Sequence, residues 1–216
     1  MPLKDDFIAR ALEQLAEAVR ALTALQSEQN AENLRAVLEE AYREHTGSKA
    51  SLFHTLPSEQ ILHILKSAGT LDREKAFLMA KLFQAEAALA KLRGDAQDRY
   101  QLKALDLSLE AALADLDMAE LDDTISELEA ALTAYNLPEL TEWRRFDYAA
   151  YKGNYAHAED LLFGLAERFP SELTKDKGRS FYQTLRQLTD DKLVAGNLSR
   201  AEVEEGLRAF EALVLT

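Results

Sequence analysis

Residues 143–170 of the chain read WRRFDYAAYKGNYAHAEDLLFGLAERFP. Apolar residues recur there at intervals of three and four on both sides of Gly153, which is the spacing of an amphipathic helix. Glycine ends helices readily because it adopts left-handed backbone angles, and Pro170 cannot continue a helix. The stretch therefore predicts two antiparallel helices, over 138–151 and 154–169, joined by a short turn.

The hairpin is similar to a tetratricopeptide repeat in part of its spacing, although Trp143 lies one residue late and the glycine usual in the first helix is absent. In that repeat, small residues let two helices approach closely. The matching residues are Gly153, Tyr155, Ala158 and Pro170. A second candidate, over 82–107, has Gly94-Asp95 at its turn, with Lys103-Ala104-Leu105 two residues early. We therefore expect repeated helical hairpins.

The rest of the chain also predicts helix, because Ala, Leu and Glu dominate it. No run of alternating β-branched residues and no Asn-Gly or Asp-Gly hairpin indicates a strand. We predict an all-α fold of about nine to ten helices, arranged as a tetratricopeptide-like α-solenoid; an irregular helical bundle is the alternative. The further helices are expected over 4–25, 28–45, 57–67, 72–93, 96–116, 119–135, 178–195 and 199–214, with a loop over 46–57.

Residue types at the helix ends agree with these boundaries. Asp72 is a candidate N-cap for the helix over 72–93, and Gly94 is a candidate stop. Ser199 and Glu202 have the spacing of a capping box at the start of the last helix.

The chain predicts a single domain over 1–216, with two subdomains, 1–136 and 137–216, left open. The second part is richer in aromatic residues: Trp143, Phe146, Tyr148, Tyr151, Tyr155, Phe163, Phe169, Phe181 and Tyr182. A gradual change in packing residues along one solenoid explains this shift equally well.

Composition excludes several classes of protein. The 216 residues include 25 Lys+Arg against 38 Asp+Glu, for a formal net charge of −13, with 47% hydrophobic residues and no Cys. The acidic balance opposes nucleic-acid binding, and no apolar run approaches the length of a membrane span. Asp5 and Asp6 stand where a signal peptide would carry positive charge. We expect a cytoplasmic protein with no nucleic-acid or membrane partner.

The first half resembles a family of uncharacterised bacterial proteins, found mainly in Gram-positive lineages and described as tetratricopeptide-like. The resemblance covers roughly residues 5–115. The matching stretches are DFIARALEQ at 6–14, LPSEQIL at 56–62, LDREK at 71–75 and KAL at 103–105. The resemblance implies a helical fold and implies no activity.

Few residues indicate chemistry. Glu59 and His63 stand at i and i+4, and His54 precedes them in the expected loop; a zinc site needs three or four convergent ligands. The acidic run over 115–123 lacks the glycine of a calcium loop and fits a helix start better. No nucleophile elbow, P-loop or dinucleotide-binding motif is present. We expect no catalytic, cofactor-binding or metal-binding residues, and no enzyme.

The candidate protein-binding residues form two groups. The first is Trp143, Arg144, Arg145 and Tyr148, because arginine binds carboxylates and stacks on aromatic rings; an internal ion pair with Glu142, Asp147 or a neighbouring helix is the alternative. The second, on one side of the first expected helix, is Asp6, Arg10, Glu13 and Gln14.

These features favour a non-enzymatic protein-interaction module that binds a protein or peptide, with a preference for basic partners. Two alternatives stay open. One is a structural protein that self-associates into a homo-oligomer through the helix over 4–25 or 119–135. The remote one is a metal-dependent hydrolase around Glu59 and His63.

Overall fold

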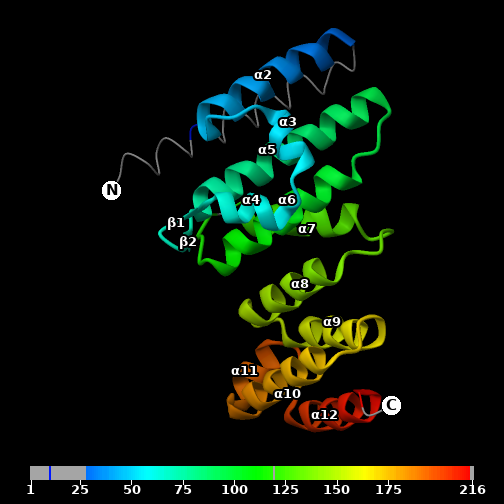
Figure 1. Ribbon diagram of the computed structural model, residues 1–216. Coiled ribbons are helices and arrows are strands. Elements are labelled where there is room, and N and C mark those ends of the chain that lie inside the picture. Colours follow the sequence, from blue (N-terminus) through cyan, green and yellow to red (C-terminus); the bar gives the residue numbers. More distant parts are fainter. Residues whose placement is uncertain (1–9, 11–27, 119, 215–216) are drawn as a thin grey trace. The chain divides into compact units, whose positions relative to one another are not determined.

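The computed structural model describes residues 10, 28–118 and 120–214 of the chain (Figure 1). Within these residues it contains eleven helices and one hairpin of two-residue strands, so the predicted all-α class is confirmed. None of the described helices has an apolar stretch long enough to cross a membrane. The expected helix over 4–25 lies outside the described residues, apart from Arg10.

The chain divides into two compact units, 1–136 and 137–216. The first unit contains α2 (Glu28–Thr46), α3 (Ala50–Thr55), α4 (Ser58–Ile64), β1 (Lys66–Ser67), β2 (Thr70–Leu71), α5 (Arg73–Arg93), α6 (Asp98–Leu113) and α7 (Leu121–Ala131). The second contains α8 (Glu139–Tyr151), α9 (Tyr155–Arg168), α10 (Glu172–Gln187), α11 (Asp190–Ala195) and α12 (Arg200–Val214).

Helix α5 is the centre of the first unit, because α2 and α6 both pack against it. Alanines at Ala76, Ala80 and Ala87 are buried along it, and their small side chains let the neighbouring helices approach closely. Phe77 and Phe83 fill the remaining space and are fully buried. Almost every side of α5 is therefore covered by other helices.

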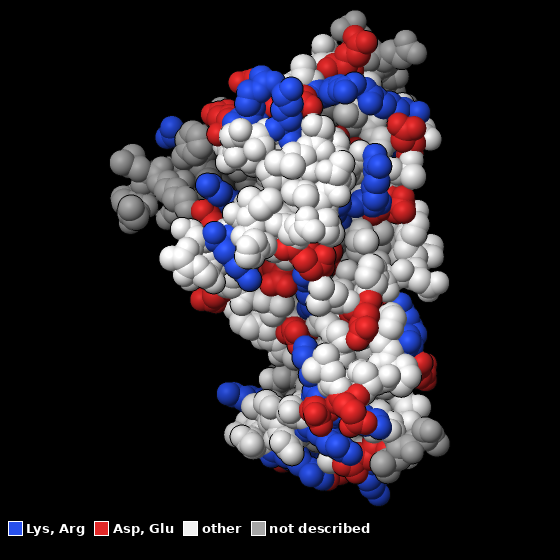
Figure 2. All heavy atoms as spheres, in the orientation of Figure 1, with Lys and Arg blue, Asp and Glu red and all other residues white. Residues whose placement is uncertain are grey.

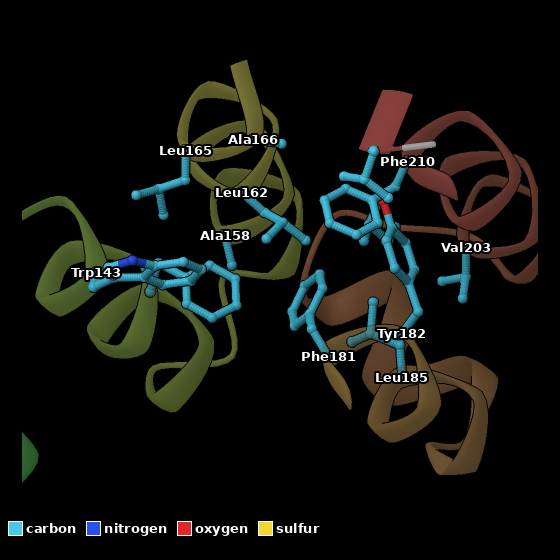
Figure 3. Packing of buried hydrophobic residues seen from close by; sticks show 14 of the residues in the cluster. Trp143, Ala158, Leu162, Leu165, Ala166, Phe181, Tyr182, Leu185, Val203 and Phe210 are labelled. Carbon is cyan, nitrogen blue, oxygen red and sulfur yellow. The ribbon is translucent and has the colours of Figure 1, made fainter. Parts of the chain in front are cut away.

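The second unit consists of two helical hairpins, α8–α9 and α10–α12, with the short α11 inside the second (Figure 1). Helix α9 packs against α8, α10 and α12. Side chains from these four helices form one buried cluster, which contains Trp143, Leu162, Phe181, Tyr182 and Phe210 (Figure 3). This cluster fixes the spacing between the two hairpins.

The predicted helix ends are confirmed where caps were named. The Asp72 carboxylate accepts a hydrogen bond from the backbone N–H of Lys75, and Gly94 ends α5 with φ +72°. The Glu202 carboxylate accepts from the Ser199 N–H, while the Ser199 hydroxyl accepts from the Glu202 N–H. Both halves of the capping box are therefore formed.

Four predicted boundaries are wrong. The expected helix over 119–135 ends at Ala131, four residues early. The expected loop over 46–57 contains α3, and the expected helix over 57–67 ends at Ile64, before the strand hairpin. The expected helix over 178–195 is two helices, because Leu188 and Thr189 are extended. Its start is also earlier, since the Ser171 hydroxyl accepts from the Thr174 N–H and begins α10 in a polar stretch that carries no apolar stripe.

Candidate functional site

The two hairpins of the second unit repeat part of their sequence. Glu-Leu-Thr begins α8 at 139–141 and begins α10 at 172–174. Gly-Asn precedes α9 at 153–154 and recurs before α12 at 196–197, and Ala-Glu follows each pair at the same distance. The two Gly-Asn turns lie against each other, because the Ala156 N–H donates to the Gly196 carbonyl at 3.0 Å. Equivalent residues thus begin equivalent helices.

A close approach explains the glycine at 196. A Cβ there would lie 2.2 Å from the Tyr155 ring and 2.5 Å from the Gly153 carbonyl oxygen. Only glycine allows the two turns to touch at this position. The contact holds the second hairpin beside the first.

An open hollow of about 440 Å³ lies between α8 and α10 on the second unit. Its floor is largely aromatic and apolar. Phe146 and Phe181 pack edge to face with ring centroids 5.3 Å apart, and Tyr155 and Leu185 extend the apolar lining. We call this hollow the α8–α10 groove; its lining is Phe146, Asp147, Ala150, Tyr155, Asp176, Lys177, Ser180, Phe181, Thr184 and Leu185.

Exposed apolar side chains continue along both walls of the groove. Leu140 and Tyr151 are 46% and 53% exposed, and helical spacing puts them on the face of α8 that carries Asp147. Leu173 is 57% exposed and shares its face of α10 with Ser180. A stripe of apolar surface therefore runs beyond the hollow along both helices.

Lys177 crosses one end of the groove. Its Nζ lies 3.2 Å from Asp147 Oδ2 and 4.4 Å from the centroid of the Trp143 ring. An ammonium group is attracted to the face of an indole ring as well as to a carboxylate. Asp176, which is well exposed, places a second carboxylate on the same rim. Asp176 also has a cation nearby, since Arg179 Nη1 lies 4.0 Å from its Oδ1. The rim thus offers two acidic side chains beside the aromatic floor, each with a basic neighbour on α10.

A partly buried hydrogen bond supports the floor from below. Tyr182 lies edge to face with Phe181, with centroids 5.4 Å apart, and its hydroxyl donates to Glu159 Oε1 at 2.7 Å. Burial raises the pKa of the Glu159 carboxyl, over the opposing effect of this hydrogen bond. Burial also raises the pKa of Tyr182, and the Glu159 carboxylate adds to that shift. Helices α9 and α10 are therefore joined by a polar contact as well as by packing.

The residues at 143–148 that were predicted to bind a protein differ in how far they are buried. Trp143 is buried; its ring packs edge to face on Phe146, and its Nε1 donates to Glu139 Oε1. Arg144 is buried as well. Tyr148 is half-buried. Trp143 therefore borders the groove as part of its support rather than as open surface.

Arg145 takes part in an internal ion pair. Its Nη1 lies 2.7 Å from Glu142 Oε2, and Arg168 binds the other oxygen of the same carboxylate at 2.6 Å. Two residues along a helix correspond to a rotation of about 200°, so Arg145 faces away from Asp147 and the groove. The internal ion pair with Glu142, which was the alternative to protein binding by this arginine, is therefore present.

Among the candidates near the N-terminus, Asp6, Glu13 and Gln14 lie outside the described residues. Arg10 is helical and exposed.

The residues considered for metal binding are not brought together. His54 Nε2 lies 2.9 Å from Glu86 Oε1, while Glu59 and His63 are exposed on α4. In the part of the chain that the structure describes, no three side chains of His, Asp or Glu converge in an arrangement that could hold a metal ion. In the acidic run, Asp122 and Asp123 occupy the first turn of α7.

Sequence reasoning missed most of the groove, including Phe146, Asp147, Lys177 and Phe181. The repeated Glu-Leu-Thr and Gly-Asn pairs are the signal that could have found it. They align α8 with α10, and the space between two such equivalent helices is where the groove lies. The insertion of α11 lengthens the second hairpin and hides the repeat from a search at one fixed period.

The comparisons with known proteins identify a family without assigning an activity. No curated protein and no solved structure matches the chain. Residues 2–214 match DUF6483, a family of unknown function. Because the match covers nearly the whole sequence, including both units, the chain belongs to this family.

Proposed function

We propose that the chain is a non-enzymatic protein-interaction module and that a segment of a partner protein binds in the α8–α10 groove. The observation that carries the proposal is the open hollow of about 440 Å³ with an aromatic floor, flanked by exposed Leu140, Tyr151 and Leu173. Exposed apolar surface rimmed by polar residues is typical of surfaces that bind other proteins.

The repeated hairpins support the same proposal. The proposal includes a tetratricopeptide-like arrangement, in which the first helices of successive hairpins line one surface. It also includes a cytoplasmic location and a bacterial source. Stacked helical hairpins present such surfaces to extended peptides or helices. The two groove carboxylates, Asp147 and Asp176, favour a partner segment with a basic residue next to a large apolar one.

Self-association through the helix over 119–135 has less support. The apolar stripe of that segment is buried within the first unit: Leu121, Ile125, Leu128 and Leu132 are each at most 3% exposed. Acidic and basic side chains both occur on the visible face of each unit (Figure 2).

A displayed peptide library tests the proposal. The full chain is the bait, and peptides enriched on it are then measured against a Ser180→Arg/Thr184→Arg variant, which places two large cations on the exposed groove wall. Gln183→Arg/Gln187→Arg is the matched control, because these residues have the same spacing on α10 and are exposed outside the groove lining.

We expect the groove variant to weaken binding by about tenfold or more, which corresponds to about 1.4 kcal/mol, and the control to leave it within about twofold. Circular dichroism of both variants checks that helix content is unchanged. Equal binding by the wild type and the groove variant, or no enriched peptide, contradicts the proposal.

A further inference from the structure

A second hollow, of about 200 Å³, lies entirely within the first unit. It is lined by the ends of α2 and α4, by α3, by the strand hairpin and by the start of α5. The hairpin forms one wall, and its turn uses left-handed backbone at Ala68 (φ 51°) and Gly69 (φ 85°). We call this hollow the hairpin pocket.

The interior of the hairpin pocket is apolar. Phe53, Leu78 and Met79 are almost completely buried beneath it, while Leu52 and Ile64 line it and remain 43% and 53% exposed. A cavity of roughly 150 Å³ lined by such side chains holds benzene. The hairpin pocket can therefore accept one ring, or a short aliphatic chain of about six to eight carbons.

The rim of the pocket is cationic in an acidic protein. Lys66 from β1 and Lys75 from α5 both line it. Within the described residues, no hydrogen bond or ion pair holds either ammonium group. The acidic group of the lining, Asp72, is engaged in capping α5, where its Oδ1 accepts from the Lys75 N–H at 3.2 Å. Asp72 keeps its negative charge while it caps α5, so it offsets one of the two lysine charges and the lining keeps one positive charge in excess.

Neutral polar groups complete the rim. His45 lines the pocket beside Lys75, and burial lowers the pKa of its imidazole, with Lys75 acting in the same direction against the opposing charge of Glu44. Ser48 and Ser67 add hydroxyl groups. Imidazole and hydroxyl groups donate hydrogen bonds to an anion without a charge of their own.

We propose that the hairpin pocket binds a small monocarboxylate, with its apolar body against Phe53 and Met79 and its carboxylate between Lys66 and Lys75. An apolar interior with a few convergent polar groups is the usual form of a small-molecule site. The lysine pair sets the sign of the ligand, and the volume sets its length. This site is separate from the α8–α10 groove and does not depend on the function proposed for that groove.

Calorimetric titration of the full chain tests the site with three probes: benzoate, hexanoate and benzyl alcohol. Benzyl alcohol has the ring of benzoate without its charge. We expect both carboxylates to bind with a dissociation constant on the order of 1 mM or tighter, since they have only about eight or nine non-hydrogen atoms each. We expect the alcohol to bind at least about tenfold more weakly.

A double variant, Lys66→Gln/Lys75→Gln, removes the rim charges without changing the apolar interior. Its control is Lys91→Gln/Lys192→Gln, which changes the net charge equally at two exposed lysines outside the pocket. We expect the rim variant to lose about tenfold in benzoate affinity and the control to keep it within about twofold. Undetectable binding of both carboxylates at about 10 mM, equal binding of alcohol and carboxylate, or an equal loss in both variants overturns the proposal.

Discussion

Helices α5 and α10 have central places in their units, yet they differ in what they leave exposed. Helix α5 is packed against α2 and α6, and twelve of its residues are buried. Helix α10 packs against α9 and α12 and buries five residues: Thr174, Gly178, Phe181, Tyr182 and Leu185. The uncovered side of α10 is a wall of the groove. A helix that is buried on nearly every side supports the fold, whereas a helix with one uncovered side leaves a surface that a partner can use.

The two units also differ in how the hydroxyl of a buried tyrosine is hydrogen-bonded. Tyr42 and Tyr182 are both fully buried. The Tyr182 hydroxyl donates to Glu159, whereas the Tyr42 hydroxyl has no hydrogen-bond partner among the described residues. Tyr42 is held by rings instead, because it stacks on Phe53 and meets Phe83 edge to face. Five substitutions test this comparison.

The largest effect is expected from truncating the aromatic core in each unit. Phe210→Ala and Phe83→Ala each remove a fully buried ring. We expect each to lower the free energy of unfolding by about 3–5 kcal/mol, because the cavity left behind closes only in part. Urea denaturation followed by circular dichroism measures both losses. A loss below about 1 kcal/mol for either variant would show that its ring is not packed as the structure has it.

Tyr182→Phe is expected to have the next largest effect. It removes the donor to Glu159 and leaves a half-buried carboxylate without that hydrogen bond. We expect a loss of about 1.5 kcal/mol in the free energy of unfolding at pH 7. The same denaturation experiment checks the value, and unchanged stability would contradict the hydrogen bond.

Tyr42→Phe is expected to act in the opposite direction. The substitution keeps the ring and its stacking on Phe53 and removes a buried hydroxyl that has no hydrogen-bond partner within residues 28–118 and 120–214. We expect stability to be unchanged or to rise by up to about 1 kcal/mol. A loss as large as that of Tyr182→Phe would mean that both tyrosines are hydrogen-bonded and would remove this difference between the units.

The smallest expected effect is a change in the pH dependence of stability, produced by Glu159→Gln. The folded-state pKa of Glu159 is raised above its ordinary value of 4.5. The contribution of this group to stability is therefore fully present below about pH 4.5 and is lost as the pH rises through the raised value. We expect the free energy of unfolding to fall less over this range in the variant, as measured by denaturation at a series of pH values. Parallel pH curves would contradict the raised pKa.

The two units also differ in net charge. The first unit holds 24 Asp and Glu against 14 Lys and Arg, and the second holds 14 against 11. The acidic surplus that suggested a basic partner therefore belongs mainly to the first unit, whereas the groove lies in the second. A preference of the groove for basic segments has to come from Asp147 and Asp176 rather than from the net charge.

The predicted helices were most accurate where residue types act locally. Asp72, Gly94 and the Ser199–Glu202 pair ended or began their helices as expected, because each cap is a hydrogen bond or a backbone angle within a few residues. The prediction failed at Ser171, where a cap begins a helix in a polar stretch, and at Leu188, where apolar residues continue while the backbone becomes extended. The interaction-module function and the single-domain or two-subdomain organisation stay predictions.

The sequence by itself determined the all-α class, most helix boundaries and the overall acidic charge, since these depend on local propensity, spacing and counts of residues. Only the tertiary structure decided which charged and aromatic side chains are accessible. It paired Arg145 with Glu142, buried Trp143 under Lys177, and placed Lys66 and Lys75 at the rim of one pocket. The physical reason is that burial and pairing depend on contacts between helices far apart in the chain, and periodicity within one helix does not specify which neighbour covers it.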